Sequence, residues 1–317
     1  MVQTIYLLLK SARPRQWLKN LSVYAALIFS GFFFFDWPSY FVQVTIAFIL
    51  FCILSSSIYI INDVIDRPAD RQHPFKNKRP IASGKLSVPL ALGASLLGLL
   101  TVFWVSSHIS FFLLMIMLGY LLLQISYSLY FKHVAILDVL SIAAGFIFRV
   151  YAGAIVVNLH MSVWFLLTVI SASLFLAVGK RQSERTLLAS LQDKVSTRKS
   201  LDKYSLRLLD IYTGMFANAT WLTYALFAFQ QDSSISQGNL PTLLAYIPRA
   251  FTAQKWLMLT VPVVIYGVMR YLQLVYESNQ GESPERVLLN DKPLLFAVLL
   301  FGLMVMTIIY FVETIAL

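Results

Sequence analysis

Cysteine is almost absent from this sequence of 317 residues, in which Cys52 stands alone. A single thiol excludes an internal disulfide framework and any metal cluster built from cysteines. Charged residues are also scarce, at 13% of the chain. The sequence lacks G-x-x-x-x-G-K-S/T, G-x-S-x-G, H-E-x-x-H and G-x-G-x-x-G. These absences exclude the common nucleotide, serine-hydrolase, zinc-protease and dinucleotide signatures.

Apolar residues dominate what is present: 58% of the chain is hydrophobic, and its mean hydropathy is +0.72. This composition is typical of a membrane protein. A transmembrane helix needs about 20 apolar residues, and nine stretches qualify: 17–35, 41–61, 88–107, 109–131, 134–159, 161–178, 211–229, 256–276 and 293–312. Because lipid offers backbone groups no partners, each stretch is expected to be a helix. The sequence therefore predicts an all-α, polytopic membrane protein with nine transmembrane helices.

The charged residues predict how these helices cross the membrane. With the N-terminus in the cytoplasm, all but four of the 25 Lys and Arg residues fall on the inner side. An odd number of spans then places the C-terminus outside. All but three of the 15 Asp and Glu residues also lie at the inner side, so we expect the active site to face the cytoplasm.

The clearest candidate site is an acidic run after the second predicted span. Asn62, Asp66 and Asp70 are spaced by four residues, so one helix would place their oxygens on the same face, beside Asp63. Pro68 is expected to break or restart that helix. Crowded carboxylates favour a bridging cation, and Mg²⁺ prefers oxygen ligands and substrate phosphates. The alternative is that these acids are solvated and paired with nearby arginines.

A second group follows the fourth predicted span. Asp138 and Arg149 are eleven residues apart, about three helical turns, and share a face with Gly145 and Gly153. An arginine this deep in a span indicates a wet cavity or a bound anion. The two glycines indicate either close helix packing or space for a lipid tail.

Two further basic groups lie at the inner side. Lys180 and Arg181 follow the sixth span, where cations favour a helix end, and Arg181 can pair with Glu184 one turn away. The other group comprises Arg13, Lys19 and Asn20. These residues flank Trp17, an aromatic residue that can anchor the chain at the membrane–water interface. For both groups, the alternative interpretation is that they bind phosphate groups of a substrate.

The nine spans and these motifs resemble the UbiA-type intramembrane prenyltransferase superfamily. The resemblance rests on the run N-D-x-x-D-x-x-x-D from Asn62 to Asp70 and on a Tyr/Lys/Asp segment at the inner end of the fourth span. Longer strings are similar to the decaprenyl-phosphate phosphoribosyltransferase branch, at residues 62–84, 138–153, 179–184 and 284–289. The resemblance implies one UbiA-like domain over residues 1–317 in a bacterial inner or plasma membrane. It places active-site loops at 62–87, 131–138, 179–210 and 277–292.

Enzymes of this branch transfer 5-phosphoribose from phosphoribosyl pyrophosphate to a polyprenyl phosphate and release pyrophosphate. The resemblance and the charge pattern together imply catalytic roles for Asp66, Asp70 and Asp138. They imply a Mg²⁺ site formed by Asn62, Asp63, Asp66 and Asp70. The implied substrate-binding residues are Arg13, Lys19, Asn20, Lys76, Arg79, Tyr127, Lys132, Arg149, Lys180, Arg181 and Glu184.

Two other functions stay open. A UbiA-type enzyme that joins a prenyl diphosphate to an aromatic or quinone-precursor acceptor is expected to carry a second pair of acids. Here Ser141 and Ile142 stand where a partner of Asp138 would lie. A transporter would line a path with Arg149 and Arg270, although the polar residues gather at one side. Membrane topology accounts for the positive charge without nucleic acid, and a homo-oligomer stays open.

Overall fold

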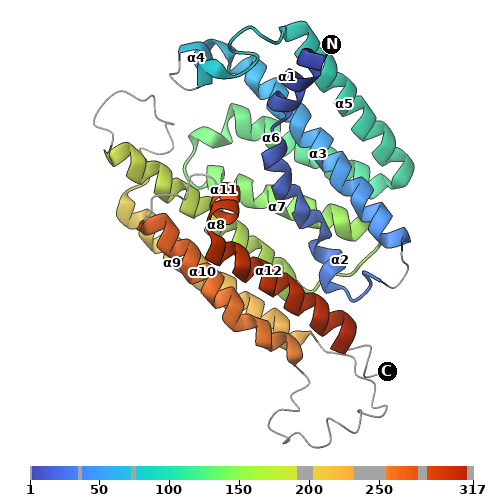
Figure 1. The fold of residues 1–317 in the computed structure, drawn as a ribbon, viewed down its shortest axis with the longest axis vertical. Helices are drawn as coiled ribbons and strands as arrows, with labels where there is room; N and C mark the ends of the chain where they lie inside the picture. The colour runs from blue at the N-terminus through green and yellow to red at the C-terminus, as the bar shows by residue number, and fades with distance from the viewer. Residues whose placement is uncertain are drawn as a thin grey trace, which may run out of the picture. The chain divides into compact units, whose positions relative to one another are not determined.

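The structure is a computed structural model that describes residues 2–34, 38–72, 76–190, 203–231, 255–277 and 284–312. In these ranges the ordered elements are all helices, which confirms the predicted all-α fold (Figure 1). Seven of the described helices are long and apolar enough to cross a membrane. The count of nine spans stays a prediction.

The chain forms two compact units, and the first comprises Met1–Leu27, Trp37–Lys132 and Phe148–Leu159. Its elements are α1 (Val2–Ala12), a 3₁₀ helix (Pro14–Tyr24), the start of α2 (Ala25–Phe29), α3 (Ser39–Ile65), α4 (Arg67–Gln72), a 3₁₀ turn (Lys76–Lys78), α5 (Val88–Ile109), α6 (Phe111–Leu129) and the second half of α7 (Leu137–Val156). The central element is α3, which packs against α1, the 3₁₀ helix, α5 and α6. Figure 1 shows α3 and α5 side by side.

Small and polar residues let the neighbouring elements approach α3 closely. The Ser56 hydroxyl donates to the carbonyl oxygen of Ala12 at 3.1 Å, and the Ser95 hydroxyl donates to that of Ser57 at 3.0 Å. At Gly98 of α5, an added Cβ would come within 2.5 Å of the Ser57 Oγ. In lipid, such close packing and interhelical hydrogen bonds drive helix association, because burial from water is no longer available.

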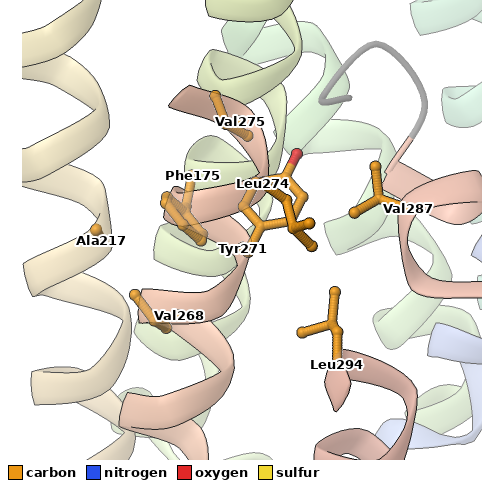
Figure 2. Close-up of a cluster of buried hydrophobic side chains, with 8 residues drawn as sticks. All are labelled: Phe175, Ala217, Val268, Tyr271, Leu274, Val275, Val287 and Leu294. Carbon is orange, nitrogen blue, oxygen red and sulfur yellow. The ribbon is translucent and has the colours of Figure 1, made fainter. Parts of the chain in front are cut away.

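The second unit comprises Ile28–Asp36, His133–Ile147 and His160–Leu317. Its described helices are the first half of α7, α8 (Val163–Ser190), α9 (Leu206–Gln230), a 3₁₀ helix (Trp256–Thr260), α10 (Val261–Tyr276), α11 (Pro284–Asn290), α12 (Lys292–Thr307) and a π-helical turn (Ile308–Val312). Helix α8 packs against α9 and α10, and α10 packs against α12. The eight buried residues in Figure 2 join these helices, with the Phe175 and Tyr271 ring centroids 5.2 Å apart.

Side-chain caps fix where two helices of the second unit begin. The Ser205 Oγ accepts a hydrogen bond from the Leu208 backbone N–H at 3.1 Å, at the start of α9. The Asp291 Oδ1 accepts from the Leu294 N–H at 2.8 Å, at the start of α12. Each cap satisfies one of the backbone donors that the first turn of a helix leaves unpaired.

The structure departs from the sequence-based prediction at residues 17–35, at the end of α8 and at α1. Residues 17–35 do not form one α-helix, since a 3₁₀ helix leads into α2, which ends at Phe29. Local polar contacts compete with the α-helical pattern there: the Ser22 hydroxyl donates to the Lys19 carbonyl oxygen at 2.9 Å. The predicted span 161–178 is too short, because α8 continues to Ser190. Helix α1 was not predicted.

All four predicted loops contain helical residues, those at 179–210 and 277–292 among them. The segment 179–190 is the end of α8, which contains no proline and carries ion pairs from Lys180 and Arg181 to Glu184 at one-turn spacing. The segment 284–290 is α11. Helix α9 begins at Leu206, inside the predicted loop 179–210. Residues 191–202 and 278–283 lie outside the described residues. The single-domain organisation stays a prediction.

Candidate active site

The acidic run lies at a helix break in the first unit. Helix α3 ends at Ile65, and α4 begins at Arg67, which confirms the break predicted from Pro68. Backbone hydrogen bonds still bridge the junction, since the Asp66 N–H donates to the Asn62 carbonyl oxygen at 2.8 Å. The Asp70 N–H likewise donates to the Asp66 carbonyl oxygen at 2.9 Å. The acids thus lie on two successive helices that are joined at Asp66.

Two carboxylates of this run are paired with arginines. The Asp63 Oδ1 accepts from Arg13 Nη2 at 2.5 Å and from Arg79 Nη1 at 3.1 Å. The same Arg79 nitrogen donates to the Asp70 Oδ2 at 2.6 Å. The Asp63 and Asp70 side chains are 3% and 5% exposed, whereas those of Arg13 and Arg79 are 33% and 28% exposed. We call these four residues the first ion-pair network.

The remaining members of the run are not part of this network. The Asn62 Oδ1 accepts from the Ser128 hydroxyl at 3.1 Å, and Asp66 is half-buried. Among the described residues, no group of three His, Cys, Asp or Glu side chains is placed to hold a metal ion. Asp63, Asp66 and Asp70 therefore do not form such a group, although their oxygens suit Mg²⁺ in kind. The predicted convergence of Asn62, Asp66 and Asp70 stays a prediction. Their assignment as metal ligands stays a prediction.

Arg149 and Asn20 lie together inside the first unit. The Arg149 Nε donates to the Asn20 Oδ1 at 2.7 Å, and its Nη2 donates to the Tyr120 hydroxyl at 2.7 Å. The guanidinium also lies 4.9 Å from the Tyr120 ring centroid and 5.8 Å from that of Phe51. Asn20 in turn donates to the Ser55 hydroxyl at 3.4 Å. This buried cluster ties the 3₁₀ helix to α3, α6 and α7.

The helix face at Gly153 is filled by protein. A Cβ added there would collide with the carbonyl oxygen of Val23 in the 3₁₀ helix. The close-packing interpretation of this glycine is therefore correct, and the face at Gly153 has no room for a lipid tail.

A separate ionic group is enclosed in the second unit. The Asp138 Oδ2 accepts from Arg181 Nε at 2.7 Å, and the Asp138 Oδ1 accepts from the Tyr204 hydroxyl at 2.8 Å. Arg181 Nη1 donates to the Glu184 Oε2 at 2.6 Å. The side chains of Asp138 and Arg181 are 0% exposed, and that of Glu184 is 19% exposed. We call these four residues the second ion-pair network.

Tyr204 is the member of this network that the sequence analysis missed. It lies just before α9, and its hydroxyl also accepts a hydrogen bond from the Ile136 N–H at 2.5 Å. Ile136 has a φ of 73°, a left-handed backbone conformation that is unusual for a β-branched residue. Burial, together with the hydrogen bond to Asp138, raises the pKa of the Tyr204 hydroxyl, so it stays a proton donor. No motif spacing marked this residue in advance.

The other predicted site residues are four lysines and Tyr127. Lys76 is exposed in the 3₁₀ turn after α4, and Tyr127 is half-buried near the end of α6. Lys132 is half-buried just after that helix. Lys19 donates to the Gln16 Oε1 at 2.6 Å. Lys180 lies 3.9 Å from Glu184 across one turn of α8. These four lysines and Tyr127 keep their predicted substrate roles as proposals.

Residues 20–290 match the UbiA prenyltransferase family. The chain belongs to this family. It is 36% identical over 296 residues to the decaprenyl-phosphate phosphoribosyltransferase of Mycolicibacterium smegmatis, which covers 90% of this chain and 87% of that protein. It is 33% identical over 293 residues to the enzyme of the same name from Corynebacterium glutamicum, covering 90% and 82%. The expectation that this UbiA chain is an integral membrane transferase is thereby confirmed.

The fold also matches solved UbiA structures. A UbiA homologue from Archaeoglobus fulgidus, bound to GPP and Mg²⁺, aligns with a TM-score of 0.67 over 96% of this chain and 99% of that chain. The two sequences are 17% identical in this alignment. This likeness confirms the predicted UbiA-like helical fold.

Proposed function

We propose that this UbiA-family enzyme transfers 5-phosphoribose from phosphoribosyl pyrophosphate to a polyprenyl phosphate. The observation that carries the proposal is the identity of 36% and 33%, over 90% of the chain, to two enzymes named decaprenyl-phosphate phosphoribosyltransferase. The partly exposed arginines at the acidic run support it, since both proposed substrates carry phosphates.

The proposed reaction needs electrostatic stabilisation more than a proton acceptor. A phosphate monoester has a second pKa of about 6, so the oxygen of the lipid phosphate is largely ionised at neutral pH. This oxygen forms a bond to C1 of the ribose, while the bond from C1 to the pyrophosphate oxygen breaks. The electron pair of the broken bond leaves with pyrophosphate. Cationic groups that stabilise the departing charge lower the barrier.

We assign the divalent ion to the acidic run. Asn62, Asp66 and Asp70 would hold Mg²⁺, which supplies positive charge to the pyrophosphate oxygens when bound. Asp66 is half-buried and accessible to a ligand. Asp70 is shared with Arg79, so the arginine and the ion would neutralise the same carboxylate. Asp63, the fourth predicted ligand, is considered separately below.

The phosphate-binding role falls to the cations with exposed surface. In the first unit these include Arg13, Arg79 and Lys76. In the second unit Lys180 is 32% exposed, whereas Arg181 is fully buried. We therefore assign Arg181 and Asp138 to positioning, because neither side chain is exposed for direct contact with ribose or phosphate.

The test is a transfer assay with purified protein in nanodiscs. Labelled phosphoribosyl pyrophosphate and Mg²⁺ are mixed with decaprenyl phosphate, and lipid-bound label is measured. A parallel reaction supplies labelled geranyl diphosphate with an aromatic acid. Label in lipid from the first mixture only is the expected result, while prenylation of the aromatic acid would replace the proposal with the other UbiA chemistry. No transfer in either mixture would contradict both.

We also propose that the N-terminus and the acidic run face the cytoplasm. The distribution of Lys and Arg supports this orientation. A variant lacking Cys52, with one new cysteine at Lys76, is expected to react in right-side-out cells only after permeabilisation. Labelling of intact cells by a membrane-impermeant maleimide would reverse the orientation.

A further inference from the structure

Asp63 differs from its neighbours in what its carboxylate contacts. One oxygen, Oδ1, accepts hydrogen bonds from two guanidinium groups, those of Arg13 at 2.5 Å and Arg79 at 3.1 Å. The side chain is 3% exposed. A divalent ion bound to this oxygen would lie next to two fixed positive charges, which repel it. Asp66, by contrast, is half-buried and lies outside the network.

The two arginines come from segments that are distant in the sequence. Arg13 lies between α1 and the 3₁₀ helix, and Arg79 lies in the loop after α4, where its N–H donates to the Lys76 carbonyl oxygen at 3.0 Å. Because both contact one Asp63 oxygen, their guanidinium groups are neighbours. Asp63 is thus the point at which the two segments meet.

The backbone and the ring beside Arg13 support a specific position for its side chain. Arg13 has φ 53° and ψ 63°, in the left-handed region. Non-glycine residues keep such conformations only where the surroundings over-determine them, often at functional sites. The Arg13 guanidinium also lies 5.1 Å from the centroid of the Tyr59 ring. These contacts orient a side chain that is still 33% exposed.

Each guanidinium has donors beyond those that Asp63 uses. An arginine carries five N–H groups in a planar fork that matches phosphate oxygens. Two such forks held side by side can bind neighbouring phosphate oxygens, and their exposed surface admits a ligand.

We infer that Asp63 is a positioning residue that holds Arg13 and Arg79 as a paired clamp for substrate phosphate oxygens, and that it is not a ligand of the divalent ion. The inference rests on the proposed function for the identity of the substrates. The phosphate oxygens belong either to the diphosphate of the donor or to the monophosphate of the lipid, and the experiment distinguishes the two.

The decisive comparison is between Asp63→Asn and Asp66→Asn, which make the same chemical change three residues apart. Binding of Mn²⁺ to the full-length protein is measured by electron paramagnetic resonance without substrate. Binding of inorganic diphosphate is measured by calorimetry. Asp63→Asn is expected to keep the Mn²⁺ affinity within about twofold and to weaken diphosphate binding about tenfold. Asp66→Asn is expected to weaken Mn²⁺ binding. Loss of Mn²⁺ binding in Asp63→Asn would overturn the inference.

Steady-state kinetics then show which substrate the clamp binds. They also test whether Asp63 acts through the two arginines. A KM rise for phosphoribosyl pyrophosphate assigns the clamp to the donor, and a KM rise for decaprenyl phosphate assigns it to the lipid. If Asp63 acts through the arginines, Asp63→Asn combined with Arg79→Gln is expected to lose little more than Arg79→Gln alone. Multiplicative losses, or unchanged KM values for both substrates, would contradict the inference.

Two further measurements keep the test independent of folding and of the proposed function. If Asp63→Asn does not yield a monodisperse protein, Arg13→Lys keeps the charge and removes the fork. This variant is expected to weaken diphosphate binding with unchanged Mn²⁺ affinity, and unchanged diphosphate binding would count against the clamp. Both binding assays need no turnover. Absence of phosphoribosyl transfer would therefore remove the proposed function while the binding results still decide the role of Asp63.

Discussion

The two ion-pair networks contain similar groups but differ in exposure. In the first network, buried Asp63 and Asp70 hold arginines that are about one-third exposed. In the second, the arginine is as buried as its carboxylate, and Tyr204 accompanies it. An exposed guanidinium is available to a phosphate, whereas an enclosed one is not. The difference fits the proposal that the first network binds substrate, whereas the second joins α7 to α8 through Asp138 and Arg181.

The largest effect is expected from a substitution that breaks the second network. Arg181→Met leaves the Asp138 charge buried beside Tyr204 without its ionic partner, and we expect it to lower the free energy of unfolding by about 3–5 kcal/mol. Arg13→Met is the matched change in the first network, where Asp63 keeps Arg79. We expect that variant to lose about 1 kcal/mol. Equilibrium unfolding in mixed micelles measures both, and equal losses would remove the distinction.

A second prediction replaces the planar guanidinium group of one arginine in each network with the ammonium group of lysine. Arg79→Lys keeps the positive charge but loses the planar donors, and we expect kcat/KM to fall about 10- to 100-fold, the loss of one or two charge-assisted hydrogen bonds. Arg181→Lys is expected to lower thermal stability while the KM values stay near those of the unmodified enzyme. Steady-state kinetics and a melting curve on each variant suffice. A KM change in Arg181→Lys would show that the buried arginine reaches substrate.

Tyr204→Phe probes the neutral member of the second network. The change removes one donor to Asp138 and leaves the Ile136 N–H without its acceptor, for a loss of about 1–2 kcal/mol in unfolding free energy. Combined with Asp138→Asn, the loss should be less than additive, because both changes remove the same contact. Strict additivity in a double-mutant cycle would mean that the hydroxyl acts on Ile136 alone.

The smallest effect concerns a third ion pair, which caps α12. Arg270 Nη2 donates to the Asp291 Oδ2 at 2.7 Å, and this contact lowers the pKa of the Asp291 carboxyl. A lowered folded-state pKa stabilises the fold above the ordinary value of about 4, and this contribution disappears as pH falls through the lowered pKa. Between pH 6 and pH 3, the melting temperature should therefore fall more for the unmodified protein than for Asp291→Asn. Parallel curves would show that the pair contributes nothing.

The sequence predicted the parts of this fold that local chemistry determines. Hydropathy located most of the long helices, and Pro68 located the break between α3 and α4. The position of Arg149 deep inside a predicted span marked it as a functional candidate. The structure places it in a buried polar cluster. These features depend on composition, on helix periodicity and on the geometry of proline.

Contacts between distant segments were beyond the reach of the sequence. The four-residue spacing selected Asn62, Asp66 and Asp70, but Asp63 gains its importance from an arginine fifty positions earlier. Tyr204 contacts Asp138 across sixty-six positions, without any spacing signal. The polar end of α8 was predicted as a loop because charged residues ended the apolar run, although they are good helix formers.

The length of α8 sets the height of the second network relative to the lipid. At 1.5 Å per residue, its 28 residues extend about 42 Å, against about 30 Å of hydrocarbon. Arg181 lies about 27 Å along the axis from Val163. If the helix enters the hydrocarbon at its first residue, the guanidinium reaches the opposite headgroup boundary, where a charge is tolerated far better than at mid-depth. On that placement, the length of α8 would put the Asp138–Arg181 pair at the water-facing edge of the bilayer.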